Sequence, residues 1–164
     1  MKVKGEVDRN KLGYRQSTSA VIINKKNRIL MVQKVGWREN EWDIPGGGVD
    51  AKETASEAIM RELKEELGCS DFEILKISQK IDCYEWSDEL ILHKQSEGKA
   101  VFRGQERKQF LVRLLSESSK IKVQAEEIRK LKWIYPEEVS AYCVFPGQLE
   151  KLKSILREFG LVSS

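Results

Sequence analysis

Aliphatic and polar residues follow one another in short runs along the first third of the chain. The segment STSAVIIN begins at Ser17, a charged stretch follows, and residues 29–34 read ILMVQK. Two aliphatic or β-branched runs joined by a polar turn are typical of paired strands, so we expect a hairpin with its turn around Lys25–Asn27. Further on, residues 42–44 predict a short strand, and the three glycines at 46–48 predict a tight turn.

The hydrophobic period then changes from that of a strand to that of a helix. Between Thr54 and Leu67, apolar residues recur at spacings of three and four, and Gly68 follows where a helix would end. These apolar positions are Ala55, Ala58, Ile59, Leu63 and Leu67. The spacing predicts an amphipathic helix, and the glycine predicts its C-cap.

The rest of the chain predicts more strands and two further helices. Strand-like content occupies residues 72–81, 108–115 and 129–135. Residues 88–106 are polar and are expected to be rich in loops. Pro136 suits the first position of a short helix, and the apolar residues of Gly147–Phe159 stand in helical register. Strands interleaved with few helices predict an α/β (α+β) fold, in which helices pack on the faces of a mixed sheet.

Size and composition indicate a single globular unit. The chain has 164 residues, of which 40% are hydrophobic and 34% charged, so it is too apolar for a disordered chain and too polar for a membrane protein. We expect one domain over residues 1–164, with its core at about residues 14–160. The longest uncharged apolar stretch, residues 17–23, is far shorter than the roughly 20 residues that span a bilayer. Neither a membrane nor an obligate protein partner is expected.

Cysteine spacing and net charge bear on the cellular compartment and on the kind of substrate. Cys69, Cys83 and Cys143 are widely spaced and form no CxxC pair, so neither a disulfide framework nor a zinc site is indicated. We expect a reducing, cytoplasmic setting. The net charge of +3 suits a substrate rich in phosphate, although composition alone favours ordinary solubility charge.

Three glutamates of the predicted helix share one face. At about 100° per residue, Glu62, Glu65 and Glu66 fall within an arc of roughly 100°. Like charges on adjacent turns weaken a helix, whereas a hard divalent cation such as Mg²⁺ prefers oxygen ligands of this kind. A solvated acidic face is the alternative. The glycines at 46–48 favour the metal site, because a backbone without side chains can approach metal or phosphate closely.

The glycine loop and the helix together carry a fixed spacing of residues. A glycine, five residues, a glutamate, seven residues and then the order Arg-Glu-aliphatic-any-Glu-Glu-any-Gly are all present. This pattern resembles the Nudix box. Its seven fixed identities are filled by Gly47, Glu53, Arg61, Glu62, Glu65, Glu66 and Gly68. The chain departs from the box at Cys69, where a larger aliphatic residue is usual, and at Lys52, where glycine is common.

The resemblance implies a Nudix-type α/β/α sandwich with a mixed sheet and a loop-helix catalytic motif. It also implies a Mg²⁺ cofactor, for which Mn²⁺ could substitute. The metal ligands would be the backbone carbonyl of Gly46 and the side chains of Glu62, Glu65 and Glu66. Arg61 would pair with Glu53 and orient it. The implied reaction is hydrolysis of a phosphoanhydride bond by attack of water on phosphorus, with Glu65 or Glu62 as the base.

A looser resemblance extends beyond the box to the subgroup of asymmetric diadenosine tetraphosphate hydrolases and bacterial RNA 5′-pyrophosphohydrolases. It rests on Tyr14-Arg15, residues 42–45, residues 104–110 and the strand of Trp133. Under it Glu127, six residues before Trp133, would complete the metal site or act as the base, with Glu126 as the adjacent alternative. Phosphate contacts would come from Arg15, Gln105, Arg107 and Lys108. Each of these basic residues could instead be a solubility charge.

Candidate contacts to a nucleobase lie in the segment DCYEWSDEL. Tyr84 and Trp86 offer flat faces for stacking, although packing between strands would explain them equally well. His93 is the single histidine and has no metal-ligand companions, so we expect it at the surface.

The resemblance leaves several substrates open. RNA-processing members tend to carry a basic pair after Val-Phe near the C-terminus, where this chain has Pro146-Gly147 after Val144-Phe145. We therefore expect a dinucleoside polyphosphate, such as diadenosine tetraphosphate, as the leading substrate. An RNA 5′ end and a free nucleoside triphosphate are the close alternatives. A binding module that has lost catalysis is disfavoured, because none of the box glutamates is missing.

Overall fold

The computed structural model describes residues 7–163. Within this range no helix is long and apolar enough to cross a membrane. The single domain expected over residues 1–164 remains a prediction, and residues 1–6 and 164 lie outside the described part of the chain.

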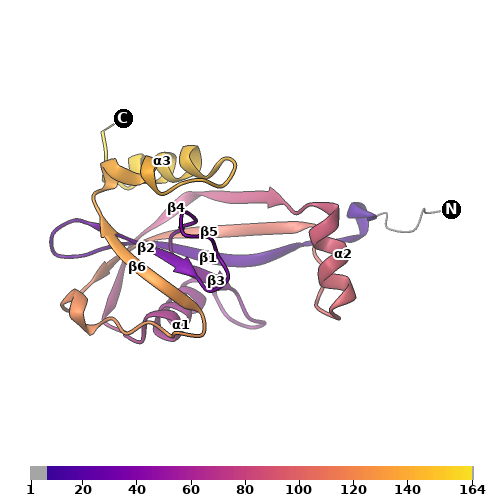
Figure 1. Cartoon of the computed structure of the whole chain (residues 1–164), viewed down its shortest axis with the longest axis horizontal. Coiled ribbons are helices and arrows are strands. Elements are labelled where there is room, and N and C mark those ends of the chain that lie inside the picture. The colour runs from indigo at the N-terminus through magenta and orange to yellow at the C-terminus, as the bar shows by residue number, and fades with distance from the viewer. Residues whose placement is uncertain (1–6, 164) are drawn as a thin grey trace.

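A mixed six-stranded sheet forms the centre of the molecule (Figure 1). The strands are β1 (Tyr14–Ile23), β2 (Ile29–Lys34), β3 (Gly46–Gly48), β4 (Phe72–Glu85), β5 (Gly104–Leu114) and β6 (Ile128–Ile134). Their order is β4-β5-β1-β2-β6, and β3 pairs with β1 off this path. Strands β1 and β5 run parallel, whereas the other pairs are antiparallel. The predicted mixed sheet and the hairpin of β1 and β2 are therefore confirmed.

Helices cover both faces of the sheet, with α1 on one face and α3 on the other (Figure 1). The helices are α1 (Ala55–Leu67), α2 (Asp88–Ser96) and α3 (Gln148–Glu158), with 3-10 turns η1 (Arg9–Lys11), η2 (Ser118–Lys120) and η3 (Pro136–Ala141). One buried cluster joins Ile59, Leu63 and Leu67 of α1 to the sheet. A second joins Leu152 and Leu156 of α3 to the opposite face. The predicted α/β/α sandwich is confirmed.

Helix α1 has defined stops at both ends. The Thr54 hydroxyl accepts a hydrogen bond from the Glu57 backbone N–H, and the Glu57 carboxylate accepts one from the Thr54 N–H. This capping box satisfies two backbone donors that the first turn leaves free. At the other end Gly68 is left-handed, with φ of 61°. A Cβ at Gly68 would overlap the carbonyl oxygen of Lys122, so the position requires glycine.

The expected strand at residues 42–44 and tight turn at residues 46–48 were wrong. Asp43 forms only an isolated bridge with Val32, and the three glycines form strand β3 against β1. The physical reason lies in the spacing of the two chains. A Cβ at Gly46 would overlap the Thr18 carbonyl, so only glycine allows β3 to lie this close to β1.

The expectation of loops over residues 88–106 was also wrong, because this segment begins with helix α2. Ser87 caps the helix by accepting a hydrogen bond from the Leu90 N–H, and acidic residues occupy the first turn. Only Ile91 of this helix is buried, so its hydrophobic pattern is too weak to indicate a helix. Strand β4 also continues four residues beyond the expected end at Ile81.

Replacing Gly68 by alanine should destabilise the fold more than the same change at Gly98. Both glycines have positive φ, of 61° and 73°, so alanine is strained at either position by roughly 1–2 kcal/mol. A Cβ at Gly98 meets no atom within 4 Å, whereas one at Gly68 overlaps a backbone oxygen. We expect Gly68→Ala to cost at least about 1 kcal/mol more in the free energy of unfolding measured with urea. Equal losses would contradict the packing at this helix end.

Candidate active site

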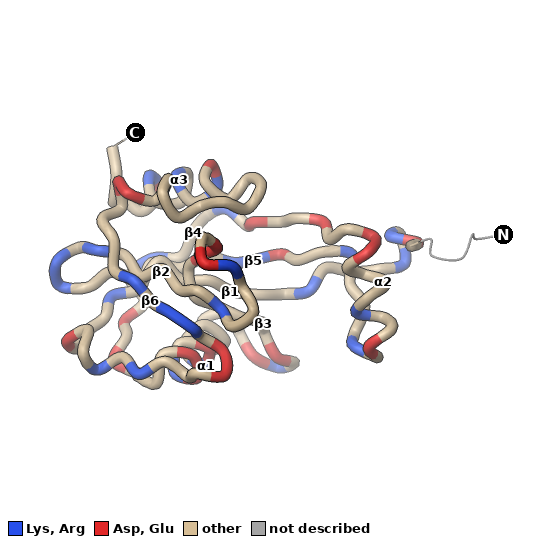
Figure 2. Tube along the Cα trace, viewed as in Figure 1, with Lys and Arg blue, Asp and Glu red and all other residues tan. Residues whose placement is uncertain are grey.

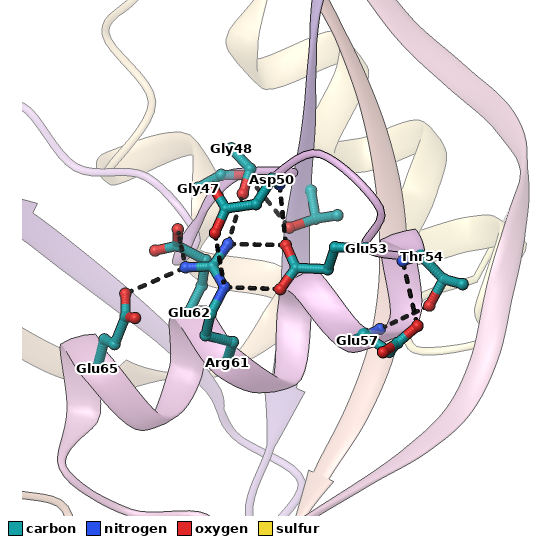
Figure 3. Close-up of polar contacts among 10 residues, drawn as sticks. Gly47, Gly48, Asp50, Glu53, Thr54, Glu57, Arg61, Glu62 and Glu65 are labelled. Carbon is teal, nitrogen blue, oxygen red and sulfur yellow. Dashed lines mark hydrogen bonds and ion pairs between the residues drawn. The ribbon is translucent and has the colours of Figure 1, made fainter.

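The guanidinium of Arg61 joins the glycine loop to helix α1 (Figure 3). Its Nε donates to Glu53 Oε2 at 2.7 Å, and Nη2 donates to Glu53 Oε1 and to the Gly48 carbonyl, both at 2.9 Å. Nη1 donates to Glu62 at 3.0 Å and to Glu65 at 3.2 Å. Arginine suits this position, because its planar fork presents several donors at once. The loop and the helix face are thereby held in one arrangement.

Glu53 is the carboxylate that anchors the loop. Besides Arg61, it accepts a hydrogen bond from the Asp50 backbone N–H at 2.9 Å. The hydrogen bonds from Arg61 and then from Asp50 lower the pKa of Glu53 to about 2. An ionised Glu53 is therefore part of the folded loop.

Glu66 is the most deeply buried of the three helix glutamates. Burial, together with the nearby charges of Glu62 and Glu127, raises its pKa to about 7 against the opposing effect of Lys34. Its Oε2 is buried and has no hydrogen-bond partner among the described residues. An unpaired buried carboxylate oxygen is costly, so this atom has the surroundings of a ligand to a cation.

Glu62 lies between the glycine loop and the other carboxylates. Its side chain packs so closely against the loop that a Cβ at Gly47 would overlap its carboxylate. Burial raises the pKa of Glu62, although the charge of Arg61 opposes this effect. The glycine at position 47 is therefore needed to admit the carboxylate.

Two further charged residues approach this cluster from outside the helix. Glu127 lies near enough to Glu62 and Glu66 to raise the pKa of both. Its backbone carbonyl accepts a hydrogen bond from the Val35 N–H at 3.0 Å, which fixes the start of β6 beside the end of β2. Lys34, the last residue of β2, was missed by the sequence analysis. Its place two residues after buried Val32 on the same strand face is the signal that could have found it.

The carboxylates do not form a closed cage as they stand. Within residues 7–163, no three His, Cys, Asp or Glu side chains are gathered closely enough to hold a metal ion. Glu62 and Glu65 are instead turned toward Arg61, and the Glu65 side chain is 51% exposed. The donor set still fits a hard cation, because it consists of carboxylate oxygens, one of them buried and unpaired.

A strip of polar side chains continues from the glycine loop along β1 and β5. These strands pair in parallel with Arg15 opposite Gln105. The Gln105 amide donates to the Ser17 hydroxyl at 2.7 Å, and the Arg15 guanidinium lies where a Cβ of Gly48 would meet it. Arg15 and Gln105 thus stand beside the loop that carries the candidate metal site.

Arg107 is held by acidic side chains. Its guanidinium contacts Asp43 and Asp82, each at 3.2 Å, and Asp82 in turn pairs with Lys151 of α3 at 2.7 Å. Burial disfavours the charged form of Arg107, but the two aspartates outweigh it and raise the pKa. The sequence analysis predicted a phosphate contact for Arg107 and missed its two partners, Asp43 and Asp82, and the Lys151 that pairs with Asp82. They come from separate segments, so no local spacing reveals them.

A cavity of about 610 Å³ opens beside this charged group. Aromatic side chains from three segments contribute to its lining: Trp37, Tyr84, Trp86 and Phe145. Tyr84 lies under the Lys151 ammonium, 5.1 Å from the ring centroid, and Trp86 packs edge-on against Phe102 at 6.3 Å. Trp86 is mostly buried, so packing accounts for much of its contact area. Both predicted aromatic residues therefore face one cavity.

Two residues considered in the sequence analysis lie away from this strip. Lys108 follows Arg107 on β5, so its side chain points to the opposite face of the sheet. His93 is exposed on α2 and pairs with Glu97 at 2.7 Å. Lys108 is thus not brought together with Arg15 and Gln105.

The chain matches a known domain family over most of its length. The family model described as the NUDIX domain covers residues 13–159. An RNA pyrophosphohydrolase of Orientia tsutsugamushi (strain Boryong) is 30% identical over 152 residues, which cover 92% of each chain. An RNA pyrophosphohydrolase of Sphingopyxis alaskensis is 31% identical over 158 residues, or 94% of this chain and 98% of the relative.

Solved structures share the fold at lower sequence identity. The E. coli dihydroneopterin triphosphate pyrophosphohydrolase has a TM-score of 0.66 at 22% identity, over 89% of this chain and 99% of that one. A C. elegans Ap4A hydrolase in a binary complex has a TM-score of 0.60 at 19% identity, over 88% and 95% of the two chains. Members of the matched family generally use divalent metal ions. With its box residues assembled around α1 and the family model spanning residues 13–159, this chain belongs to the Nudix hydrolases, enzymes of the pyrophosphohydrolase type.

Proposed function

We propose that this chain is a Mg²⁺-dependent pyrophosphohydrolase that cuts a phosphoanhydride bond at the 5′ end of a nucleotide chain. The observation that carries the proposal is the unpaired, buried Oε2 of Glu66 within a group of like charges that includes Glu62 and Glu127. A divalent cation would satisfy this oxygen and remove the repulsion. Mn²⁺ could take the same place, because it also prefers oxygen ligands.

The proposed metal ligands come from the loop, the helix and the start of β6. They are the Gly46 carbonyl and the carboxylates of Glu62, Glu65, Glu66 and Glu127. Arg61 pairs with Glu62 and Glu65 in this structure, and we infer that these side chains exchange this pairing for the cation. Bound metal would neutralise phosphate charge and lower the pKa of a coordinated water.

A glutamate close to the metal must accept the proton from the attacking water. Glu62 and Glu65 are both candidates, since each can reach water at the site from α1. Glu65 is the better one, because its half-exposed carboxylate can pass the proton on to solvent. Glu127, the residue that precedes β6, is the third candidate. Glu53 and Arg61 are assigned a positioning role, because their hydrogen bonds hold the loop to the helix.

Substrate phosphates would lie along the strip beside the glycine loop. Arg15 and Gln105 are the proposed contacts there, with arginine suited to bidentate binding of phosphate oxygens. Arg107 is engaged by Asp43 and Asp82, so we assign it to the floor of the aromatic cavity instead. A base entering that cavity would stack against Tyr84 or Trp86. Lys108 is left out of this proposal because it points to the other sheet face.

Triphosphorylated RNA is the substrate that we favour, and a dinucleoside polyphosphate is the second candidate. Curated relatives that are 30–31% identical over more than 90% of this chain are named RNA pyrophosphohydrolases. The second candidate rests on Pro146-Gly147, which stand where RNA-processing members tend to carry basic residues. Both substrates present consecutive phosphates to the same strip, so their common chemistry is compatible with one site.

A substrate panel tests the proposal directly. The purified chain would be incubated with Mg²⁺ and triphosphorylated RNA, diadenosine tetraphosphate, nucleoside triphosphates or ADP-ribose, and the products identified by mass. Release of pyrophosphate or phosphate from RNA at the highest kcat/KM would support the favoured substrate. Preference for diadenosine tetraphosphate would support the second candidate. Inactivity on the whole panel would contradict both candidate substrates and would favour a non-catalytic binding module.

Replacing Glu66 by glutamine should separate metal binding from folding. Without metal the variant should be more stable than the wild type, because it removes a buried carboxylate with an unpaired oxygen. It should also lose most of the rise in Tm that Mg²⁺ gives the wild type. We expect kcat/KM to fall at least about 100-fold, or roughly 3 kcal/mol in transition-state stabilisation. An unchanged response of Tm to Mg²⁺ would contradict the ligand assignment.

Glu127 and Glu126 form a matched pair of variants. Both residues are exposed, but Glu127 is the one close enough to raise the pKa of Glu62 and Glu66. Glu127→Gln should lower kcat/KM by about 10- to 100-fold and raise the Mg²⁺ concentration needed for half activity. Glu126→Gln should leave both quantities near wild type. Equal effects of the two changes would remove Glu127 from the proposed ligand set.

The positioning role of Glu53 predicts a characteristic dependence of stability on pH. Its pKa falls on folding from about 4.5 to about 2, so the ionised form stabilises the folded state. This contribution is complete above pH 4.5 and is lost as the pH falls through 2. Glu53→Gln should therefore be less stable than wild type near neutral pH, with a difference that shrinks toward pH 2. Urea unfolding in EDTA would measure it; a difference independent of pH would refute the role.

A further inference from the structure

A second polar hollow lies at the turn of the β1–β2 hairpin, away from the box residues. Its volume is about 380 Å³. Three cations and three hydroxyls contribute to its lining: Lys25, Lys26, Arg28, Ser116, Ser118 and Ser119. We call it the turn pocket. Figure 2 shows basic positions gathered at this hairpin turn and again along β6.

The charges of the turn pocket are not balanced by their neighbours. Glu117 is the acidic residue of its lining, and it pairs with Lys25 at 2.8 Å. Within residues 7–163 no ion pair involves Lys26. Lys26 is still close enough to Glu117 to help lower the pKa of that carboxylate. One carboxylate thus faces three cations, and an excess of positive charge remains to attract an anion. A surface with ordinary solubility charge would intersperse both signs.

Arg28 lines this pocket and has one buried guanidinium nitrogen without a hydrogen-bond partner in the described part of the chain. Its guanidinium lies 4.5 Å from the centroid of the Tyr135 ring, and Nη2 donates to the Tyr135 hydroxyl at 2.8 Å. Its Nε is buried and has no acceptor among the described residues. An oxyanion that drew the guanidinium toward the pocket would supply this acceptor, as phosphate does for the fork of an arginine. The hydroxyls of the serine segment could donate to the same oxyanion.

The turn pocket is joined to the candidate active site by the chain itself. Residues 116–127 lead from its serines to Glu127, and β6 then runs back from Glu127 to Trp133, which also lines the pocket. Six residues of strand measure about 20 Å at roughly 3.3 Å each. Exposed Lys120 and Lys122 lie on the connecting segment. Between Glu117 and Glu126 the charged residues of this segment are therefore both basic.

We propose that the turn pocket binds a phosphodiester in the body of an RNA whose 5′ end lies at the box glutamates. The inference rests on the proposed function and adds a contact about six nucleotides downstream, given that stacked nucleotides rise by roughly 3.4 Å each. A dinucleoside polyphosphate cannot make this contact, since its phosphates are consecutive and stay near the metal. The pocket thus gives the enzyme a preference for longer chains.

Hydrolysis of two substrates that differ only in length tests this inference. Wild type should have a lower KM for a triphosphorylated RNA of about 12 nucleotides than for a triphosphorylated dinucleotide. Lys26→Glu should raise the KM for the longer RNA about five- to tenfold and reduce the salt dependence of its binding, because a phosphate contact is lost. The kcat, and the KM for the dinucleotide, should not change. Arg28→Gln should act in the same direction.

A charge reversal elsewhere on the surface controls for net charge, and a binding measurement separates the pocket from hydrolysis. Lys153→Glu changes the net charge equally on exposed α3 and should leave both KM values as in wild type. Fluorescence anisotropy with a 5′-hydroxyl RNA of the same length measures binding to the pocket without hydrolysis. Inactivity on RNAs of both lengths would therefore contradict the proposed function alone. The turn pocket is refuted if wild type shows no length preference and no such binding. It is also refuted if Lys26→Glu raises the KM for both RNA lengths equally. The same holds if Lys153→Glu raises the KM for the longer RNA as much as Lys26→Glu does.

Discussion

The arrangement of the candidate site depends on one guanidinium. Arg61 donates to the loop through Glu53 and the Gly48 carbonyl, and to the helix through Glu62 and Glu65. Three glutamates on one helix face would repel one another, and α1 is only 13 residues long. Arg61 supplies the opposing charge from the same face. The loop and the carboxylate-bearing face of α1 are therefore held together by the protein's own side chains.

The helix and the outer architecture were predictable because their signals are local. Helix α1 is marked by its apolar period, by Thr54 at the start and by Gly68 at the end, all within a short stretch of sequence. Strand β3 could not be foreseen in the same way. Three glycines are typical of a turn, and only the close approach of Thr18 from a distant part of the chain makes them a strand. Helix α2 was missed for the opposite reason, since it buries too little to leave a pattern.

The residues of the candidate site also fall into those that local spacing predicts and those that come from distant segments. The residues of the box lie within one loop and one helix, so their spacing alone indicated which carboxylates face together. The buried group around Arg107 has members from four segments: Asp43, Asp82, Arg107 and Lys151. No spacing connects these positions, and each would pass for an ordinary surface charge when taken alone. Lys34 escaped notice because Glu66, whose pKa it lowers, stands 32 positions away in the sequence.

The segment after β5 has a structural role that follows from its backbone contacts. The Lys122 N–H donates to the Leu67 carbonyl at 2.8 Å, and the Gln124 N–H donates to the Glu66 carbonyl at 3.0 Å. These bonds satisfy acceptors that the last turn of α1 would otherwise leave free. They also fix the path of the chain toward Glu127, independently of its side-chain charge. Because the same segment begins at the turn pocket, one stretch of backbone ties the end of the catalytic helix, the outlying carboxylate and the basic hairpin turn together. The turn pocket and Glu127 are therefore held at a fixed distance from each other. A long polyanion lying across this segment would meet both without any rearrangement of the backbone.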